Sequence, residues 1–327
     1  MPPVSSGLLL AIDIGGTKTA LALASSAPCT RDVFLTRRRF RTPDSAAATL
    51  AALLPAAREL IGDRELAGIG VSFGGQVRTD EAPRFRSLVI SGWEALDVTA
   101  QFAAAFGDVP TLVANDGEAA ARGEYVSLPT EAAGADLAYI TVSTGVGGAF
   151  LLNGRPHRGR HGLAAEVGHI PLRSEGRCPC GGTGHLEAFA SGPAIAAAAV
   201  SRLTASPEVG SQLRAVVGDA GTLTARDVDD AARRGDVFAA GILGEAGSLV
   251  GHAAALISLL LDPDVIVIGG GVSQAGDAFW QPLHAAARFE ALHDTAILPS
   301  RLGPDSALRG AVELARDAAR TTDRGDR

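Results

Sequence analysis

One short pattern occurs twice in this chain: a buried strand, a turn of glycine and threonine, and a second apolar strand. The first copy spans residues 8–24 (LLLAIDIGGTKTALALA) and the second spans residues 137–152 (LAYITVSTGVGGAFLL). Apolar runs on both sides of a polar glycine turn predict a β-hairpin. From this repetition we infer two related α/β halves that face a cleft.

The rest of the chain alternates predicted helices with short strands. Ser45 stands directly before an Ala/Leu-rich stretch of helical spacing and is placed to cap it. Predicted helices span 45–61, 98–106, 191–203, 224–234, 238–261 and 306–320, and the Ala-rich stretch up to Gly123 is predicted to start another. Further predicted strands span 33–41, 67–72, 111–114 and 265–268.

Composition narrows the function classes. The 327 residues suffice for two domains, and 46% of them are hydrophobic. We expect no apolar run long enough and free enough of charge to span a membrane, and residues 1–7 show no secretory signal, so the expected location is the cytoplasm. A net charge of −7 without a clustered basic helix argues against nucleic acid as a partner.

The first glycine turn carries the residue types of a phosphate site. Asp13 ends a strand, and Gly15 and Gly16 let backbone N–H groups approach a ligand closely. Thr17 and Lys18, the only lysine of the chain, add a hydroxyl and a cation. The carboxylate is suited to hold a metal ion or its water. A plain hairpin turn is the alternative interpretation.

The second turn, with Thr144 and Gly145, has the same composition, so the two turns would clamp the β- and γ-phosphates of a nucleotide. Neither turn fits the P-loop pattern, and a strand rather than a helix follows each, which argues against a dinucleotide fold. A third turn, with Gly270 and Gly271, follows the strand 265–268 and offers main chain to an adenine or ribose. A plain strand-to-helix loop is the alternative there.

A carboxylate for proton transfer is predicted at Asp116. Asn115 and Asp116 follow the strand 111–114 directly. Phosphoryl transfer to an alcohol needs a carboxylate that orients the hydroxyl and accepts its proton, and a neighbouring amide can bind sugar hydroxyls. An Asx turn or a helix N-cap is the alternative for an isolated Asn-Asp pair.

The most specific signal is a dense group of cysteine and histidine. His169, Cys178, Cys180 and His185 lie within one loop-rich span, which is typical of a tetrahedral Cys₂His₂ zinc site. In a reducing compartment this interpretation is favoured over a disulfide. Four protein ligands leave no open position, so the zinc would be structural and would fix the loop next to two carboxylates, Glu166 and Glu187.

Together these motifs resemble the ROK family of sugar kinases and sugar-responsive repressors, and the resemblance covers about residues 8 to 318. It is carried by the order and spacing of the motifs DIGGT at 13–17, GVSFGG at 70–75, ND at 115–116, STGVGG at 143–148, EVGH at 166–169, the Cys/His loop, and GGGV at 269–272. It implies a two-domain actin/hexokinase-like (ribonuclease H-like) α/β fold that closes over the sugar. The expected domains are a smaller one, 1–116, and a larger one, 117–305, with the zinc loop at 169–187. The final helix 306–320 is expected to pack back on the smaller domain.

The resemblance also implies roles for individual residues. Asp116 would be the catalytic base and Asp13 would lie near Mg²⁺. His169 would use one ring nitrogen for zinc and the other for the sugar. The phosphates of Mg·ATP would contact Gly15, Gly16, Thr17, Thr144 and Gly145, and Lys18, Gly270 and Gly271 complete the expected ATP site, the last two at the adenine or ribose. The sugar would contact Gly75, Asn115, Asp116, Glu166, His169 and Glu187.

Three departures from the family pattern lie on the predicted sugar side. His185 stands where the family usually has a third zinc cysteine, Gly117-Glu118 replaces Ala-Asn, and the loop 73–76 lacks the usual proline. The expected function is an ATP-dependent hexokinase with glucose and its 6-hydroxyl as default. The alternatives are a kinase for glucosamine, kanosamine or an N-acetylhexosamine, which Glu118 would suit if the sugar is cationic, and a non-catalytic sugar sensor or repressor. A homodimer or homotetramer is expected.

Overall fold

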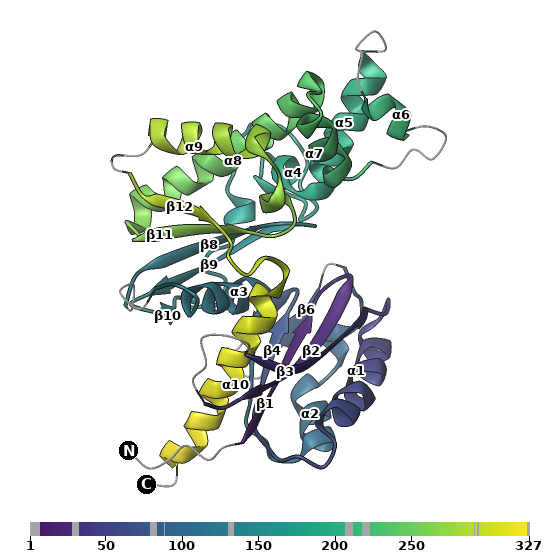
Figure 1. The fold of residues 1–327 in the computed structure, drawn as a ribbon, viewed down its shortest axis with the longest axis vertical. Coiled ribbons are helices and arrows are strands. Elements are labelled where there is room, and N and C mark those ends of the chain that lie inside the picture. The colour runs from purple at the N-terminus through teal and green to yellow at the C-terminus, as the bar shows by residue number, and fades with distance from the viewer. Residues whose placement is uncertain are drawn as a thin grey trace. The chain divides into compact units, whose positions relative to one another are not determined.

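The computed structural model describes residues 7–27, 33–78, 84–87, 89–129, 134–206, 212–217, 223–290, 292 and 294–325. The chain groups into two compact units (Figure 1). The first comprises Met1–Ala133, Pro156–Ala164 and Asp305–Arg327, and the second comprises Gly134–Arg155 and Ala165–Pro304.

The first unit is built on a five-stranded sheet of order β3-β2-β1-β4-β7. β1 and β2 form the predicted antiparallel hairpin, and β4 and β7 join it in parallel. The strands are β1 (Leu8–Ile14), β2 (Lys18–Ser25), β3 (Phe34–Arg41), β4 (Leu66–Phe73) and β7 (Thr111–Asn115), and a separate pair is formed by β5 (Gln76–Arg78) and β6 (Arg84–Arg86).

The second unit repeats this topology. Its sheet has the order β10-β9-β8-β11-β12, with an antiparallel hairpin β8/β9 followed by two parallel strands. The strands are β8 (Leu137–Val142), β9 (Val146–Leu152), β10 (Arg155–Pro156), β11 (Val265–Gly269) and β12 (Ala296–Pro299). The two related halves inferred from the repeated strand–turn–strand pattern are therefore confirmed as two sheets of one topology.

Helices cover both faces of the first sheet. α1 (Ala46–Ile61) begins at Ser45, whose hydroxyl accepts a hydrogen bond from the Ala48 N–H as predicted, and it packs with α2 (Val98–Phe106) on the face that carries Leu10 and Ile12. The opposite face, with Leu9 and Ala11, packs against α10 (Ser306–Gly325), which Figure 1 draws in yellow beside the purple strands.

Glycines let α10 approach its neighbours closely. A Cβ added at Gly70 in β4 would lie 1.9 Å from the Ala311 carbonyl oxygen, and one added at Gly310 would lie 1.6 Å from the Ala119 carbonyl oxygen in α3 (Asp116–Tyr125). Ser306 also donates to the buried Glu124 of α3 at 2.7 Å. α10 therefore fixes α3 against the sheet. For this reason α3, expected in the second domain, groups with the first unit. Residues 156–164 also group with the first unit.

The second unit contains a long central helix, α8 (Val237–Leu261). We expected no membrane-length apolar run, and α8 corrects that expectation, since it is long and apolar enough by length and composition to cross a membrane. Its most apolar window is 67% buried inside the structure, as in the core helix of a globular unit. Its other helices are α4 (Glu187–Ala190), α5 (Gly192–Ala205), α6 (Leu213–Val217), α7 (Ala225–Arg233) and α9 (Asp277–Glu290). The 3₁₀ turn Trp93–Ala95 lies in the first unit, and further 3₁₀ turns span Val167–His169, Val272–Gln274 and Gly303–Asp305.

Candidate active site

The residues predicted for the site fall into two groups, one in each unit. In the first unit, the turn between β1 and β2 is closed by a hydrogen bond from the Gly15 N–H to the Lys18 carbonyl at 3.0 Å. A Cβ on Gly15 would lie 2.9 Å from that same oxygen, so the tight turn favours glycine. The Thr42 hydroxyl donates to the Gly15 carbonyl at 2.7 Å, while Thr17 and Lys18 are exposed. The turn thus presents polar groups to solvent on a braced backbone.

Asp13 is half-buried at the end of β1. The Ser72 hydroxyl donates to its Oδ1 at 2.7 Å from the neighbouring strand β4. Burial raises the pKa of Asp13 to about 6, and the Ser72 hydrogen bond and Arg39 oppose this only in part. Ionising such a buried carboxyl group costs free energy, and a bound cation would offset this cost by stabilising the charged form. The residue therefore fits the magnesium role that the resemblance implies.

Asn115 and Asp116 form the start of α3. Asn115 is the N-cap, and its Oδ1 accepts from the N–H groups of Gly117 at 2.8 Å and Glu118 at 3.3 Å. Its Nδ2 donates to the Gly75 carbonyl at 2.9 Å and to Asp116 Oδ1 at 3.1 Å. Asn115 is therefore a helix N-cap, as the alternative interpretation held, and it also lies in contact with Gly75 and Asp116, the neighbours predicted for the site. Because these bonds fill the hydrogen-bonding capacity of the Asn115 amide, its main local effect is to orient Asp116.

Glu118 has a different role from the one considered for a cationic sugar. This buried carboxylate accepts from Arg122 Nε at 3.0 Å, and from Arg158 Nε and Nη2 at 2.8 Å each. Both oxygens are therefore engaged by guanidinium groups of the same unit, and Arg158 ties segment 156–164 to α3. The sequence pattern did not indicate Arg158, because it lies 40 positions from Glu118.

In the second unit, the second and third glycine turns lie side by side. The turn between β8 and β9 is closed by a bond from the Ser143 N–H to the Gly145 carbonyl at 2.8 Å, and Thr144 at its tip is exposed. Gly270 has a φ of +88°, and a Cβ there would lie 2.3 Å from the Val142 carbonyl oxygen at the end of β8. The structure thus brings together Thr144, Gly145, Gly270 and Gly271, the residues predicted for phosphate and nucleoside.

Glu166 is presented by an unusual backbone conformation. Ala165 has a φ of +67°, and the Val167 N–H donates to the Ala165 carbonyl at 2.7 Å, which makes Glu166 the centre of an inverse γ-turn. The carboxylate Oε2 lies 3.8 Å from His169 Nε2. Burial raises the pKa of Glu166, with His169 opposing and Glu187 adding to the shift. The structure thus groups Glu166, His169 and Glu187, the second set predicted for the sugar.

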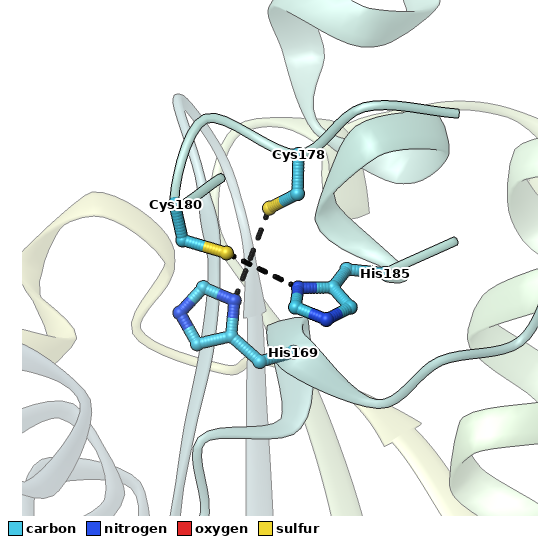
Figure 2. Close-up of side chains that lie close together, drawn as sticks. All are labelled: His169, Cys178, Cys180 and His185. Atoms are coloured by element: carbon cyan, nitrogen blue, oxygen red, sulfur yellow. Dashed lines mark hydrogen bonds between the residues drawn. The ribbon is translucent and has the colours of Figure 1, made fainter. Parts of the chain in front are cut away.

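The predicted zinc ligands converge (Figure 2). One donor atom from each of His169, Cys178, Cys180 and His185 lies within 4.8 Å of all the others. His169 Nδ1 is 3.9 Å from Cys178 Sγ, and His185 Nδ1 is 3.2 Å from Cys180 Sγ. Ligands of a tetrahedral zinc, with Zn–S of about 2.3 Å and Zn–N of about 2.0 Å, lie roughly 3.3–3.8 Å apart, so the donor set fits the ion. With Nδ1 directed at the cluster, Nε2 of His169 is turned toward Glu166.

Burial raises the pKa of the Cys178 thiol to about 11, with Cys180 and Glu187 as further contributors. Zinc must therefore displace a proton that the metal-free protein holds firmly. We expect about one zinc per chain in protein purified without chelator, because four ligands close the site. Elemental analysis checks this, with Cys180→Ser as the variant expected to weaken retention. Metal-free wild-type protein from zinc-supplemented cells would contradict it.

Two sheets of one topology, each with a glycine turn in its first hairpin, define the actin/hexokinase-like class of two-domain α/β proteins. The ROK family sequence model matches residues 9–318. The glucokinase of Streptomyces coelicolor is 30% identical over 322 residues, which cover 95% of this chain and 98% of the relative. An N-acetylmannosamine kinase of Yersinia pestis is 28% identical and covers 94% of this chain and 98% of its own length.

A solved structure agrees with these relatives. The ROK family glucokinase of Streptomyces griseus, in complex with glucose and AMPPNP, superposes with a TM-score of 0.80 at 30% identity and covers 95% of this chain and 100% of its own. The chain therefore belongs to the ROK family. It is a sugar kinase, a phosphotransferase that uses an alcohol group as acceptor.

Proposed function

We propose that this protein transfers the γ-phosphoryl group of ATP to a hexose hydroxyl, with glucose and its 6-hydroxyl as the first candidate. The observation that carries the proposal is the placement of Asp116 at the first turn of α3, where Asn115 and the Gly117 N–H hold one of its oxygens. The likeness to a glucokinase solved with glucose and an ATP analogue supports the choice of both substrates.

Asp116 acts as the base in this proposal. The N-terminus of a helix favours a negative charge, so α3 stabilises the ionised carboxylate that accepts a proton. The bonds from Asn115 Nδ2 at 3.1 Å and from Gly117 N–H at 2.9 Å fix Oδ1 and with it the plane of the carboxylate. A positioned base of this kind contributes about 10²- to 10⁴-fold to such reactions.

The glycine turns provide the phosphate contacts. Backbone N–H groups of Gly16, Thr144 and Gly145 neutralise charge that builds on the transferred group, and Lys18 adds a cation. Gly15, whose N–H closes the first turn, lines the phosphates beside them. Gly270 and Gly271 offer main chain to the nucleoside. Magnesium, when bound, would neutralise phosphate charge, and Asp13 would hold the ion or its water. Glu166, His169, Glu187 and Gly75 are proposed sugar contacts. Asn115 is proposed to join them by exchanging one of the bonds of its amide for a bond to the sugar.

An N-acetylhexosamine is the second candidate substrate. It is supported by the likeness to an N-acetylmannosamine kinase over 94% of the chain. The main argument for a cationic amino sugar as substrate was the carboxylate of Glu118. That carboxylate is already paired with two arginines, so the argument no longer holds. A cytoplasmic location and a homodimer or homotetramer stay predictions, and so does the structural zinc.

ADP release with Mg·ATP across a panel of glucose, mannose, fructose, glucosamine, kanosamine and the N-acetylhexosamines tests the proposal. We expect one neutral hexose or N-acetylhexosamine, glucose first, to be phosphorylated with a kcat/KM at least about tenfold above the others, since a site that hydrogen-bonds one set of hydroxyls rejects sugars that leave its groups unpaired. Binding of a sugar without ADP release would contradict the kinase assignment and favour a sensor.

A further inference from the structure

Both ends of the zinc loop contact the second glycine turn. The loop is closed at its base by a hydrogen bond from the Leu186 N–H to the Ile170 carbonyl at 3.0 Å. On the His169 side, a Cβ on Gly168 would lie 2.0 Å from the Val146 carbonyl oxygen, and one on Gly148 would lie 2.9 Å from the Val167 side chain. The segment that enters the metal cluster is thus packed directly against the turn.

Glu187 makes the contact on the His185 side. Its Oε2 accepts a hydrogen bond from the Val146 N–H at 2.9 Å, and its Oε1 lies 3.8 Å from Cys178 Sγ. A Cβ on Gly145 would lie 2.7 Å from Oε2. One carboxylate therefore bridges a predicted zinc ligand and the backbone of the turn proposed to hold phosphate.

The same helix junction contacts the turn a second time. Glu187 begins α4, and the Gly192 N–H at the start of α5 donates to the Ser143 carbonyl at 2.7 Å. Val146 is buried, so its N–H depends on the Glu187 carboxylate for a partner, and such a charge-assisted bond is roughly twice as strong as a neutral one. The conformation of the turn thus depends on where Glu187 is held.

We infer that Glu187 is a positioning residue for the nucleotide: it transmits the order of the zinc loop to the Ser143–Gly148 turn, so that zinc occupancy sets nucleotide affinity. This role adds to the sugar contact proposed for Glu187 and rests on the proposed function, since it takes Thr144 and Gly145 as phosphate contacts. Metal bound at Cys178 and His185 fixes the chain directly before Glu187. Without it, the carboxylate loses its fixed position and the turn loses its bridge.

Three variants separate positioning from sugar contact. Glu187→Ala removes the acceptor of the Val146 N–H, whereas Glu187→Gln keeps an acceptor oxygen and removes only the charge. Glu175→Ala is the matched control, because Glu175 is an exposed carboxylate of the same loop that is not among the proposed ligands or substrate contacts. Calorimetric titration with Mg·ADP in the absence of sugar reads nucleotide affinity alone.

We expect Glu187→Ala to bind Mg·ADP about tenfold more weakly, as loss of a hydrogen bond to a charged group predicts. Glu187→Gln should largely restore wild-type affinity, and Glu175→Ala should leave it unchanged. Zinc-free wild-type protein should resemble Glu187→Ala and should exchange the Val146 amide hydrogen faster. Circular dichroism and zinc content confirm that each variant is folded and loaded.

Zinc-loaded Glu187→Ala with wild-type Mg·ADP affinity, or zinc-free wild-type protein with unchanged affinity, would overturn the inference. If the wild-type protein phosphorylates a sugar in either case, the proposed function stands and only the coupling fails. Wild-type protein that binds no Mg·ADP at all would overturn the proposed function, and the coupling with it.

Discussion

Asp116→Asn is expected to lower turnover by about 10²-fold or more while the sugar binds with nearly unchanged affinity. The asparagine oxygen can still accept from Asn115 Nδ2 and the Gly117 N–H, the two partners of Oδ1 at 3.1 and 2.9 Å, so the start of α3 should keep its geometry. What disappears is the proton acceptor. An effect on kcat and kcat/KM together, without a change in sugar affinity, is the signature of an interaction made in the transition state.

Asp97→Asn is the matched control for this change. Asp97 is the N-cap of α2 and accepts from the Ala100 N–H at 2.9 Å, and asparagine caps helices as well as aspartate does. Steady-state ADP release and calorimetric sugar binding should therefore be unchanged in Asp97→Asn. Wild-type turnover in Asp116→Asn would exclude Asp116 as the base and move the search to another carboxylate.

Gly310→Ala is expected to destabilise the first unit by about 2 kcal/mol or more. The added methyl carbon would lie 1.6 Å from the Ala119 carbonyl oxygen and 2.4 Å from its carbon, and these are backbone atoms that move only if α3 or α10 moves. Because α3 begins at Asp116, we also expect turnover to fall. Urea unfolding followed by circular dichroism measures the stability, and ADP release measures the consequence for the site.

Gly241→Ala is the control for Gly310→Ala: it is the same substitution, but it is expected to raise stability instead of lowering it. Gly241 is exposed in α8, and a Cβ there would meet nothing within 4 Å. Alanine in an open helix position stabilises by about 0.5–1 kcal/mol relative to glycine, so this variant should be slightly more stable than the wild type. If Gly310→Ala behaved like Gly241→Ala, the close packing of α10 on α3 would be refuted.

Local sequence determined most elements of the fold and one whole cluster of the site. α2 spans the predicted residues 98–106, and Ser45 caps α1 as predicted. Such features can be predicted because helical spacing, capping side chains and turn residues act within a few positions of one another. The four candidate zinc ligands could be predicted from the sequence for the same reason, since three of them lie within eight residues. α9 (Asp277–Glu290) was not predicted, because Pro282 interrupts its pattern, and β12 was not predicted, because it is a run of only four residues that ends in Pro299.

Tertiary structure alone decided the contacts that support the site. The pair Glu118–Arg158, the bond from the Val146 N–H to Glu187, and the approach of Gly310 to Ala119 join segments 40 to 191 positions apart. Nothing in the local pattern around a glycine or a glutamate says which distant backbone atom it will meet. The sequence by itself therefore determined which residues we propose for the chemistry, and long-range packing decided how those residues are held.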